Sequence, residues 1–168
     1  MSMKRSPAVA VLMTVTMLAG CSAAGDSEPF HPTDVVKLDE GTVDGLGWTL
    51  VTFHDAEGET CLELRDADMR ENTDLSGGCG PWDDNPTGGR YMDGAGPGQS
   101  DFAYGLLKEA VATVTATAPG QNPMTVPAKP MPAGSEAAKF FVIAFPEAST
   151  TWRYTAKDDH GAPVELGP

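Results

Sequence analysis

The stretch that decides the fold is Lys139-Phe140-Phe141-Val142-Ile143-Ala144-Phe145, an unbroken apolar run after its first residue that stops at Pro146. An apolar run of this length that ends at a turn residue is typical of a strand buried on both faces. A half-exposed strand would instead alternate apolar and polar residues. We therefore expect this segment at the centre of the hydrophobic core.

Other β-type runs lie on both sides of it, separated by turn residues. Residues 48–53 and 60–64 flank Asp55-Ala56-Glu57-Gly58 and predict an antiparallel hairpin. Residues 111–117 alternate with a period of two, which places Ala112, Val114 and Ala116 on one face. A last hairpin is predicted from residues 152–156, with Trp152, Tyr154 and Ala156 facing inward, a turn at 158–161 and a return through Val164 and Leu166.

Three weaker segments complete the expected secondary structure. Residues 124–126 offer a brief strand, which the following prolines exclude from the centre of a sheet. Residues 35–38 could add an edge strand, and only residues 101–110 are plausible as a helix, although Gly105 weakens it. The sequence thus predicts an all-β fold, a small antiparallel β-sandwich of immunoglobulin-like or similar type, in which residues 65–101 form one long disulfide-tethered loop.

The N-terminal residues have the pattern of an export signal. Lys4 and Arg5 precede an apolar stretch over residues 8–18, which is shorter than the roughly 20 residues of a permanent membrane span. Leu18-Ala19-Gly20-Cys21 resembles the lipobox of bacterial lipoproteins. The resemblance implies a lipid on the Cys21 thiol, cleavage before Cys21, and a location on the extracytoplasmic face of the cell membrane. An uncleaved anchor, or an ordinary signal peptide with an incidental cysteine, is the alternative.

These features predict a signal peptide over 1–20, a flexible tether over 21–45 and a single β-sandwich domain over 46–168. The whole chain has a net charge of −13, and cleavage before Cys21 would leave 9 basic and 24 acidic residues, a net charge of about −15. Nucleic-acid binding is improbable at this charge, because it depends on Lys and Arg neutralising phosphates. The expected contact with a membrane is through the N-terminal lipid.

With Cys21 committed to lipid, Cys61 and Cys79 remain as an even pair in an oxidising compartment, and we expect a disulfide. A redox pair or a metal site is the alternative. The spacing of 18 residues suits neither, because redox pairs cluster closely and zinc needs about four ligands.

The sequence contains no recognisable catalytic motif, and no catalytic residue or cofactor is predicted. Of the three histidines, only His54 lies on a predicted strand. Calcium binding by the acidic stretch 66–93 is a weaker hypothesis, with solvated loop acids as its alternative. Its candidate ligands are Asp66, Asp68, Asp83 and Asp84. Trp82 and Tyr91 are candidates for binding a sugar or partner, although such aromatics more often cover the end of a core.

The body of the chain contains Trp48, Cys61-Leu62-Glu63-Leu64, Gly78-Cys79-Gly80, Phe140-Phe141-Val142 and Asp158-Asp159-His160-Gly161. In these residues it resembles uncharacterised small exported or lipid-anchored β-proteins of actinobacteria. The resemblance implies a β fold and an exported or lipid-anchored location. It implies no catalytic residue. We expect a non-catalytic binding or structural module of the cell envelope, with an envelope protein or cell-wall component as partner. The alternative is an enzyme or calcium-dependent binder of cell-wall components that uses the acidic loop.

Overall fold

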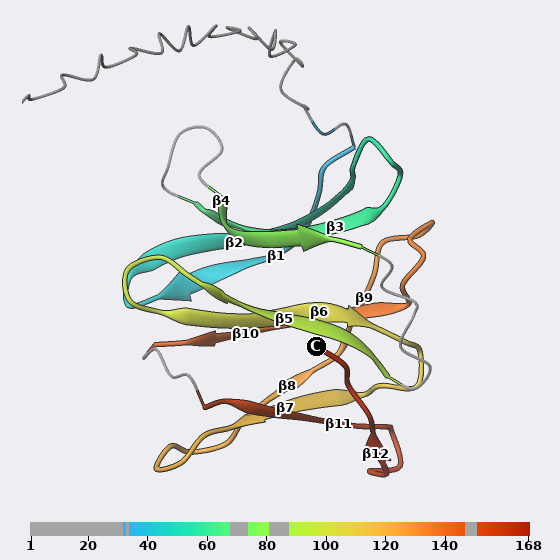
Figure 1. The fold of residues 1–168 in the computed structure, drawn as a ribbon. Coiled ribbons are helices and arrows are strands. Elements are labelled where there is room, and N and C mark those ends of the chain that lie inside the picture. Colours follow the sequence, from blue (N-terminus) through green and yellow to red (C-terminus); the bar gives the residue numbers. More distant parts are fainter. Residues whose placement is uncertain (1–31, 33, 68–73, 81–87, 147–150) are drawn as a thin grey trace, which may run out of the picture.

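The protein is built from three four-stranded antiparallel sheets stacked in layers (Figure 1). The computed structural model describes residues 32, 34–67, 74–80, 88–146 and 151–168. The first sheet has the order β1-β2-β3-β4, the middle sheet β5-β6-β10-β9 and the third sheet β12-β11-β7-β8. The strands are β1 Val36–Val43, β2 Leu46–His54, β3 Thr60–Asp66, β4 Asp74–Cys79, β5 Gly89–Ala95, β6 Asp101–Leu107, β7 Thr113–Thr117, β8 Met124–Pro127, β9 Lys129–Pro130, β10 Lys139–Phe145, β11 Arg153–Lys157 and β12 Pro163–Val164.

The predicted all-β antiparallel fold is confirmed, and the structure adds a third layer to the two of an immunoglobulin-type sandwich. The apolar faces of β10 and β6 give a physical reason for the third layer. Both strands are apolar on both faces, so each face needs a sheet packed against it. The predicted strand at residues 139–145 is confirmed as β10, in the interior of the middle sheet.

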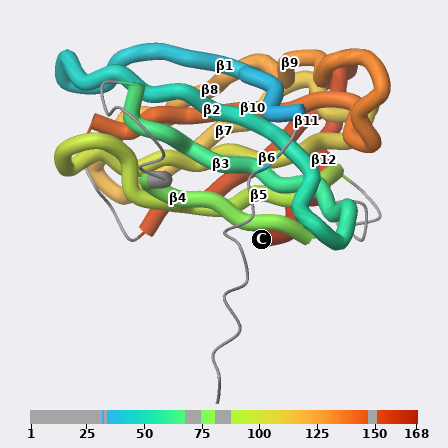
Figure 2. The backbone as a smooth tube through the Cα atoms, turned by 90° about the horizontal axis from the view of Figure 1, so that it is seen from above, coloured from blue at the N-terminus to red at the C-terminus, as the bar shows by residue number. Residues whose placement is uncertain are grey.

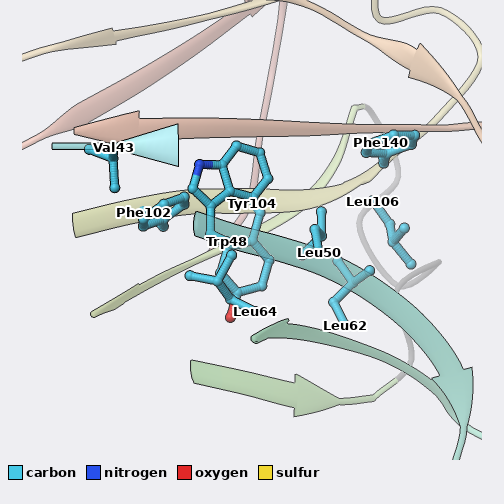
Figure 3. Close-up of a cluster of buried hydrophobic side chains, with 9 residues drawn as sticks. All are labelled: Val43, Trp48, Leu50, Leu62, Leu64, Phe102, Tyr104, Leu106 and Phe140. Carbon is cyan, nitrogen blue, oxygen red and sulfur yellow. The ribbon is translucent and has the colours of Figure 1, made fainter. Parts of the chain in front are cut away.

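Two hydrophobic cores lie on the two sides of the middle sheet. The core shared with the first sheet, drawn in Figure 3, consists of Val43, Trp48, Leu50, Leu62, Leu64, Phe102, Tyr104, Leu106 and Phe140. The core on the side of the third sheet consists of Ala103, Leu107, Val111, Val114, Ala116, Phe141, Ile143, Phe145 and Ala156. Neighbouring residues of β6 and β10 therefore point into different cores, as the alternation of a strand requires.

The helix expected over 101–110 is wrong, because residues 101–107 form strand β6. β6 pairs with β5 on one side and β10 on the other. Gly105 lies opposite Tyr91 and Phe141, and a Cβ atom at this position would meet the Arg90 carbonyl oxygen at 2.1 Å. Glycine thus allows a close approach of two strands here, as it does in sheets generally.

The long disulfide-tethered loop expected over residues 65–101 is also wrong, because this segment contains strands β4 and β5. β4 completes the first sheet and β5 begins the middle one. The Tyr104 hydroxyl donates a hydrogen bond of 3.1 Å to Ser76 Oγ, joining β6 to β4 across the two layers. The segment therefore links two sheets at one edge.

The tether predicted over 21–45 is too long at its C-terminal end, because the first sheet already begins with β1. The edge strand suggested at residues 35–38 is confirmed as the start of β1, and Val43 at its end is buried in the core. A two-residue turn, Asp44-Gly45, joins β1 to β2, and both residues have positive φ values of 51° and 80°. Asp-Gly is the preferred sequence for such a hairpin turn.

Both predicted hairpins are confirmed, and their turns are built alike. In the β2–β3 turn, Asp55 Oδ1 accepts hydrogen bonds from the amides of Glu57 and Glu59. In the β11–β12 turn, Asp158 Oδ1 accepts them from the amides of His160 and Ala162. The aspartate side chain replaces a backbone acceptor in each turn.

The C-terminal residues lie along β5, at the edge of the middle sheet (Figure 2). The Tyr91 amide donates to the Gly167 carbonyl oxygen at 3.0 Å, and the Gly167 amide donates to the Gly89 carbonyl oxygen at 3.1 Å. These bonds occupy backbone groups of β5 that would otherwise be open to pairing with another chain.

Cys61 and Cys79 form the expected disulfide, with their sulfur atoms at a bonding distance of 1.96 Å. The two cysteines lie opposite each other in the register of β3 and β4. On the face of the first sheet that points away from the middle sheet, Cys61 packs with Val51 and Phe53. In the described part of the chain, no helix has the length and apolarity needed to cross a membrane.

Candidate ligand-binding pocket

A surface pocket of about 290 Å³ lies where the middle sheet meets the third sheet. It is at the end of these sheets where β5 finishes and β6 and β11 begin, on the left in Figure 1. Its described lining residues are Asp93, Gly94, Ala95, Asp101, Phe102, Trp152 and Tyr154. Two carboxylates and the rings of Trp152 and Tyr154, from three strands or their ends, therefore meet at one place.

The register of β5 and β6 brings the two carboxylates together. Asp93 lies opposite Ala103, and Asp101 lies opposite Ala95. Asp93 and Asp101 are therefore diagonal neighbours on one face of the hairpin, where Cβ atoms are roughly 7–8 Å apart. Ala103 belongs to the core under this face, so both carboxylates are on the side of the third sheet.

Tyr154 of β11 reaches across from the third sheet. Its hydroxyl donates a hydrogen bond to the Asp93 carboxylate, and its ring lies against Tyr91 with centroids 4.6 Å apart. Burial of the phenol, followed by the hydrogen bond to Asp93 and the charges of Asp93 and Asp101, raises the pKa of Tyr154 well above its ordinary value. The tyrosine is thus a neutral donor that holds one carboxylate in place.

Trp152, directly before β11, supplies the second aromatic wall. Its ring stacks on Phe145 with a centroid distance of 4.0 Å and an interplanar angle of 22°. The indole nitrogen is covered by surrounding atoms and has no hydrogen-bond acceptor among the described residues. Any part of this side chain that a ligand meets is therefore carbon.

The pocket is rich in hydrogen-bond acceptors and poor in donors. Carboxylates only accept when ionised, and the Tyr154 hydroxyl already donates to Asp93. None of the described lining residues is positively charged.

Two further cavities differ in their chemistry. A cavity of about 250 Å³ near the start of β3 and the end of β6 is lined by charges of both signs, Lys108 with Glu109 and Glu136. A cavity of about 230 Å³ includes His54, Asp34 and Ser135. No hydrogen bond joins His54 to Asp34 or Ser135 in the described part of the chain, so these residues do not form a hydrogen-bonded catalytic set.

The residues predicted from sequence are only partly placed by the structure. Tyr91 lies in β5 and packs against the second core, so it covers a core instead of forming an open aromatic surface. Asp66 ends β3, opposite Trp48 in β2. Asp68, Asp83, Asp84 and Trp82 lie outside the described residues, as does Cys21. The calcium hypothesis for the acidic stretch stays a prediction.

One group of three metal-ligating residues comes together within the described ranges, namely Asp55, Cys61 and Cys79. Their ligand atoms lie within 4.8 Å of one another. The cysteines are bonded to each other, however, and the metal ligand is a thiolate. Asp55 Oδ1 also already accepts two backbone hydrogen bonds, so this group is part of a turn beside a disulfide.

Three residues of the pocket are not predicted as site residues from the sequence, namely Asp101, Trp152 and Tyr154, and Asp93 is considered only as part of the acidic stretch 66–93. The sequence predicts Asp101 at the start of a helix and the two aromatic residues in the core. The available signal was the short turn-rich segment at 96–100, which can join two strands and align Asp93 with Asp101. No family model, no curated protein and no solved structure matches the chain.

The tyrosines give a prediction for alkaline pH. Burial is the largest cause of a raised pKa at each of Tyr91, Tyr104 and Tyr154. Because the folded pKa values lie above the unfolded value of about 10, the folded state keeps protons that the unfolded state loses. We expect their contribution to stability to be constant below about pH 10 and to fall as the pH rises above it. Denaturant unfolding at a series of alkaline pH values, with Tyr154→Phe for comparison, measures this dependence.

The variant should show a shallower loss of stability than the parent above pH 10, since it has one fewer group to ionise. Ultraviolet absorbance of tyrosinate gives the second readout. Ionisation of all three tyrosines near pH 10 in protein that is still folded would contradict the prediction.

Proposed function

We propose that this protein is a lipid-anchored binding module on the extracytoplasmic face of the cell membrane, held there by a diacylglyceryl group on Cys21. The motif Leu18-Ala19-Gly20-Cys21 and the basic and apolar residues before it support the anchor. Two acyl chains suffice for stable attachment, because each buried methylene contributes about 0.8 kcal/mol.

The observation that carries the proposal is the pairing of Cys61 with Cys79. The chain has three cysteines, so this disulfide leaves Cys21 as the one cysteine whose thiol is available for a lipid. Disulfides also persist in oxidising compartments outside the cytoplasm and are rare inside it. The pairing thus supports both the modification and the export of the chain.

The pocket between the middle and third sheets supports a binding role. It is built on strands, which hold side chains more firmly than loops do. Tethering to a membrane raises the local concentration of such a site for ligands at the same surface. Its lining presents polar and aromatic groups that can recognise a ligand. These groups are two carboxylates, a tyrosine that donates to one of them, and a tryptophan.

Metabolic labelling with a fatty acid tests the anchor. Expressed in a bacterial host, the parent should incorporate the label and Cys21→Ala should lose it completely, because no other free thiol takes its place. Ser22→Ala, which changes the neighbouring residue and leaves the thiol, should be labelled like the parent. An unlabelled parent, or a labelled Cys21→Ala, would refute the lipid anchor.

A further inference from the structure

We infer that Cys79 is the sulfur at which the Cys61–Cys79 disulfide exchanges with a small external thiol. In this reaction the thiol becomes bonded to Cys79, and Cys61 is released. Cys79 is then a site of covalent modification, independent of the lipid anchor and of the ligand-binding pocket. Three features of the first sheet support the assignment, namely the exposure of each cysteine, the direction of attack and the charge beside the bond.

The two cysteines differ in exposure. Cys61 is buried, with 1% of its surface exposed, whereas Cys79 is exposed. Cys79 ends β4, which is the last strand of the first sheet (Figure 2). The residues around it are Gly77, Gly78 and Gly80, which have no side chains to cover the sulfur. Exchange with a thiol requires access to the attacked sulfur, so the exposure favours attack at Cys79.

The direction of attack favours the same sulfur. A thiolate attacks a disulfide along the S–S axis, from the side opposite to the sulfur that leaves. Phe53, Cys61 and Cys79 lie opposite one another in the registers of β2, β3 and β4, and Phe53 packs against Cys61. An attack on Cys61 would therefore have to come from the side of Phe53. An attack on Cys79 comes from beyond β4, where no described strand is paired.

The exchange step needs no oxidant or reductant other than the thiol. The thiolate bonds to Cys79 Sγ, the S–S bond breaks, and Cys61 Sγ leaves with the electron pair. Cys61 then takes up from the solvent the proton that the external thiol lost on ionising. The product is a mixed disulfide on Cys79 beside a Cys61 thiol. Because the two cysteines are opposite in the register, Cys61 can attack the mixed disulfide and restore the original bond.

Asp55, in the β2–β3 turn, opposes the exchange. Its carboxylate has an oxygen within 4.8 Å of both sulfur atoms. Negative charge spreads over the sulfur atoms as the thiolate attacks, and a carboxylate at this distance disfavours that charge. Two backbone amides donate to Asp55 Oδ1 and hold the carboxylate beside the bond. Asp55 thus slows exchange at a disulfide that is otherwise accessible.

Peptide mapping of the full folded chain after brief reaction with 2-mercaptoethanol tests the inference. The reaction is stopped in acidic denaturant, where N-ethylmaleimide labels the released thiol before it can attack back. Cleavage after Lys37 and Arg65 puts the three cysteines on separate peptides, so the state of Cys21 does not affect the result.

Among chains that carry one thiol adduct, we expect 2-mercaptoethanol on Cys79 and N-ethylmaleimide on Cys61, in roughly tenfold excess over the reverse arrangement. The rate should rise in proportion to the thiol concentration, because the folded protein is attacked. Adducts in similar amounts on both cysteines, or mostly on Cys61, would overturn the assignment. A rate independent of thiol concentration would also overturn it, because exchange would then wait for unfolding.

Two variants test the role of Asp55. Asp55→Asn keeps an oxygen that can accept the hydrogen bonds of the turn, and it should raise the rate constant of exchange about fivefold. Glu57→Gln removes the same charge from an exposed position in the same turn and should change the rate constant by less than about twofold. An unchanged rate in Asp55→Asn, or an equal rise in Glu57→Gln, would contradict this role of Asp55.

Discussion

Phe141→Ala is expected to lower the free energy of unfolding by about 3–5 kcal/mol, the usual cost of removing a fully buried phenylalanine ring. Phe141 has no exposed surface and lies opposite Gly105, at the centre of the middle sheet. The middle sheet is one wall of both cores, so a cavity here weakens the packing that holds the third sheet in place. Denaturant unfolding of the variant and the parent measures the effect.

Val36→Ala is the matched control, because it also removes apolar carbon from a strand but at a position that is 39% exposed. Its expected cost is about 0.5 kcal/mol or less. We also expect one cooperative transition in all three proteins, since the two cores share a sheet. A cost below 1 kcal/mol for Phe141→Ala would show that β10 is not buried on both faces.

Removal of the disulfide is expected to be the second large effect. The double variant Cys61→Ala/Cys79→Ala should lose about 3 kcal/mol, because the bond closes a loop of 18 residues and restricts the unfolded chain. For a domain of this size the melting temperature should fall by about 10 °C. The double variant leaves no unpaired thiol in the body to form other bonds. Thermal unfolding followed by circular dichroism measures the change.

Reductant provides the control for this prediction. It should lower the melting temperature of the parent towards that of the double variant, and it should leave the double variant unchanged. A parent that melts at the same temperature as the double variant in oxidising buffer would refute a stabilising bond between β3 and β4.

The fold class could be predicted from the sequence because its signals are local. The apolar run of β10, the alternation of β7 and the two Asp-x-x-Gly turns are each contained in a few residues. The physical causes are burial on two faces, the period of a strand and a side-chain acceptor in a turn. These causes act without reference to distant parts of the chain.

The errors arose where the structure depends on distant partners. Residues 101–107 form a short apolar run, and length alone does not separate a buried strand from a helix. The partners that decide it are β5 and β10, and the close approach of Arg90 explains why Gly105 suits a strand there. The number of sheets could not be predicted for the same reason, since it depends on which strands pair.

The candidate pocket could not be predicted because it forms only after the sheets are stacked. Asp93 and Asp101 become neighbours through the β5–β6 register, and Tyr154 joins them from a strand about 50 residues further along the chain. Inward-facing aromatics at 152 and 154 were predicted correctly. Their position in one pocket with two carboxylates depends on how the sheets stack.

Mass spectrometry of the N-terminal peptide of the mature protein is the most direct test of the account, because it reports both processing and modification at one residue. The account predicts a peptide that begins at Cys21 and carries the mass of a diacylglyceryl group on its sulfur. A peptide that continues through Gly20 into Cys21, or one that begins at Cys21 without added mass, would contradict it.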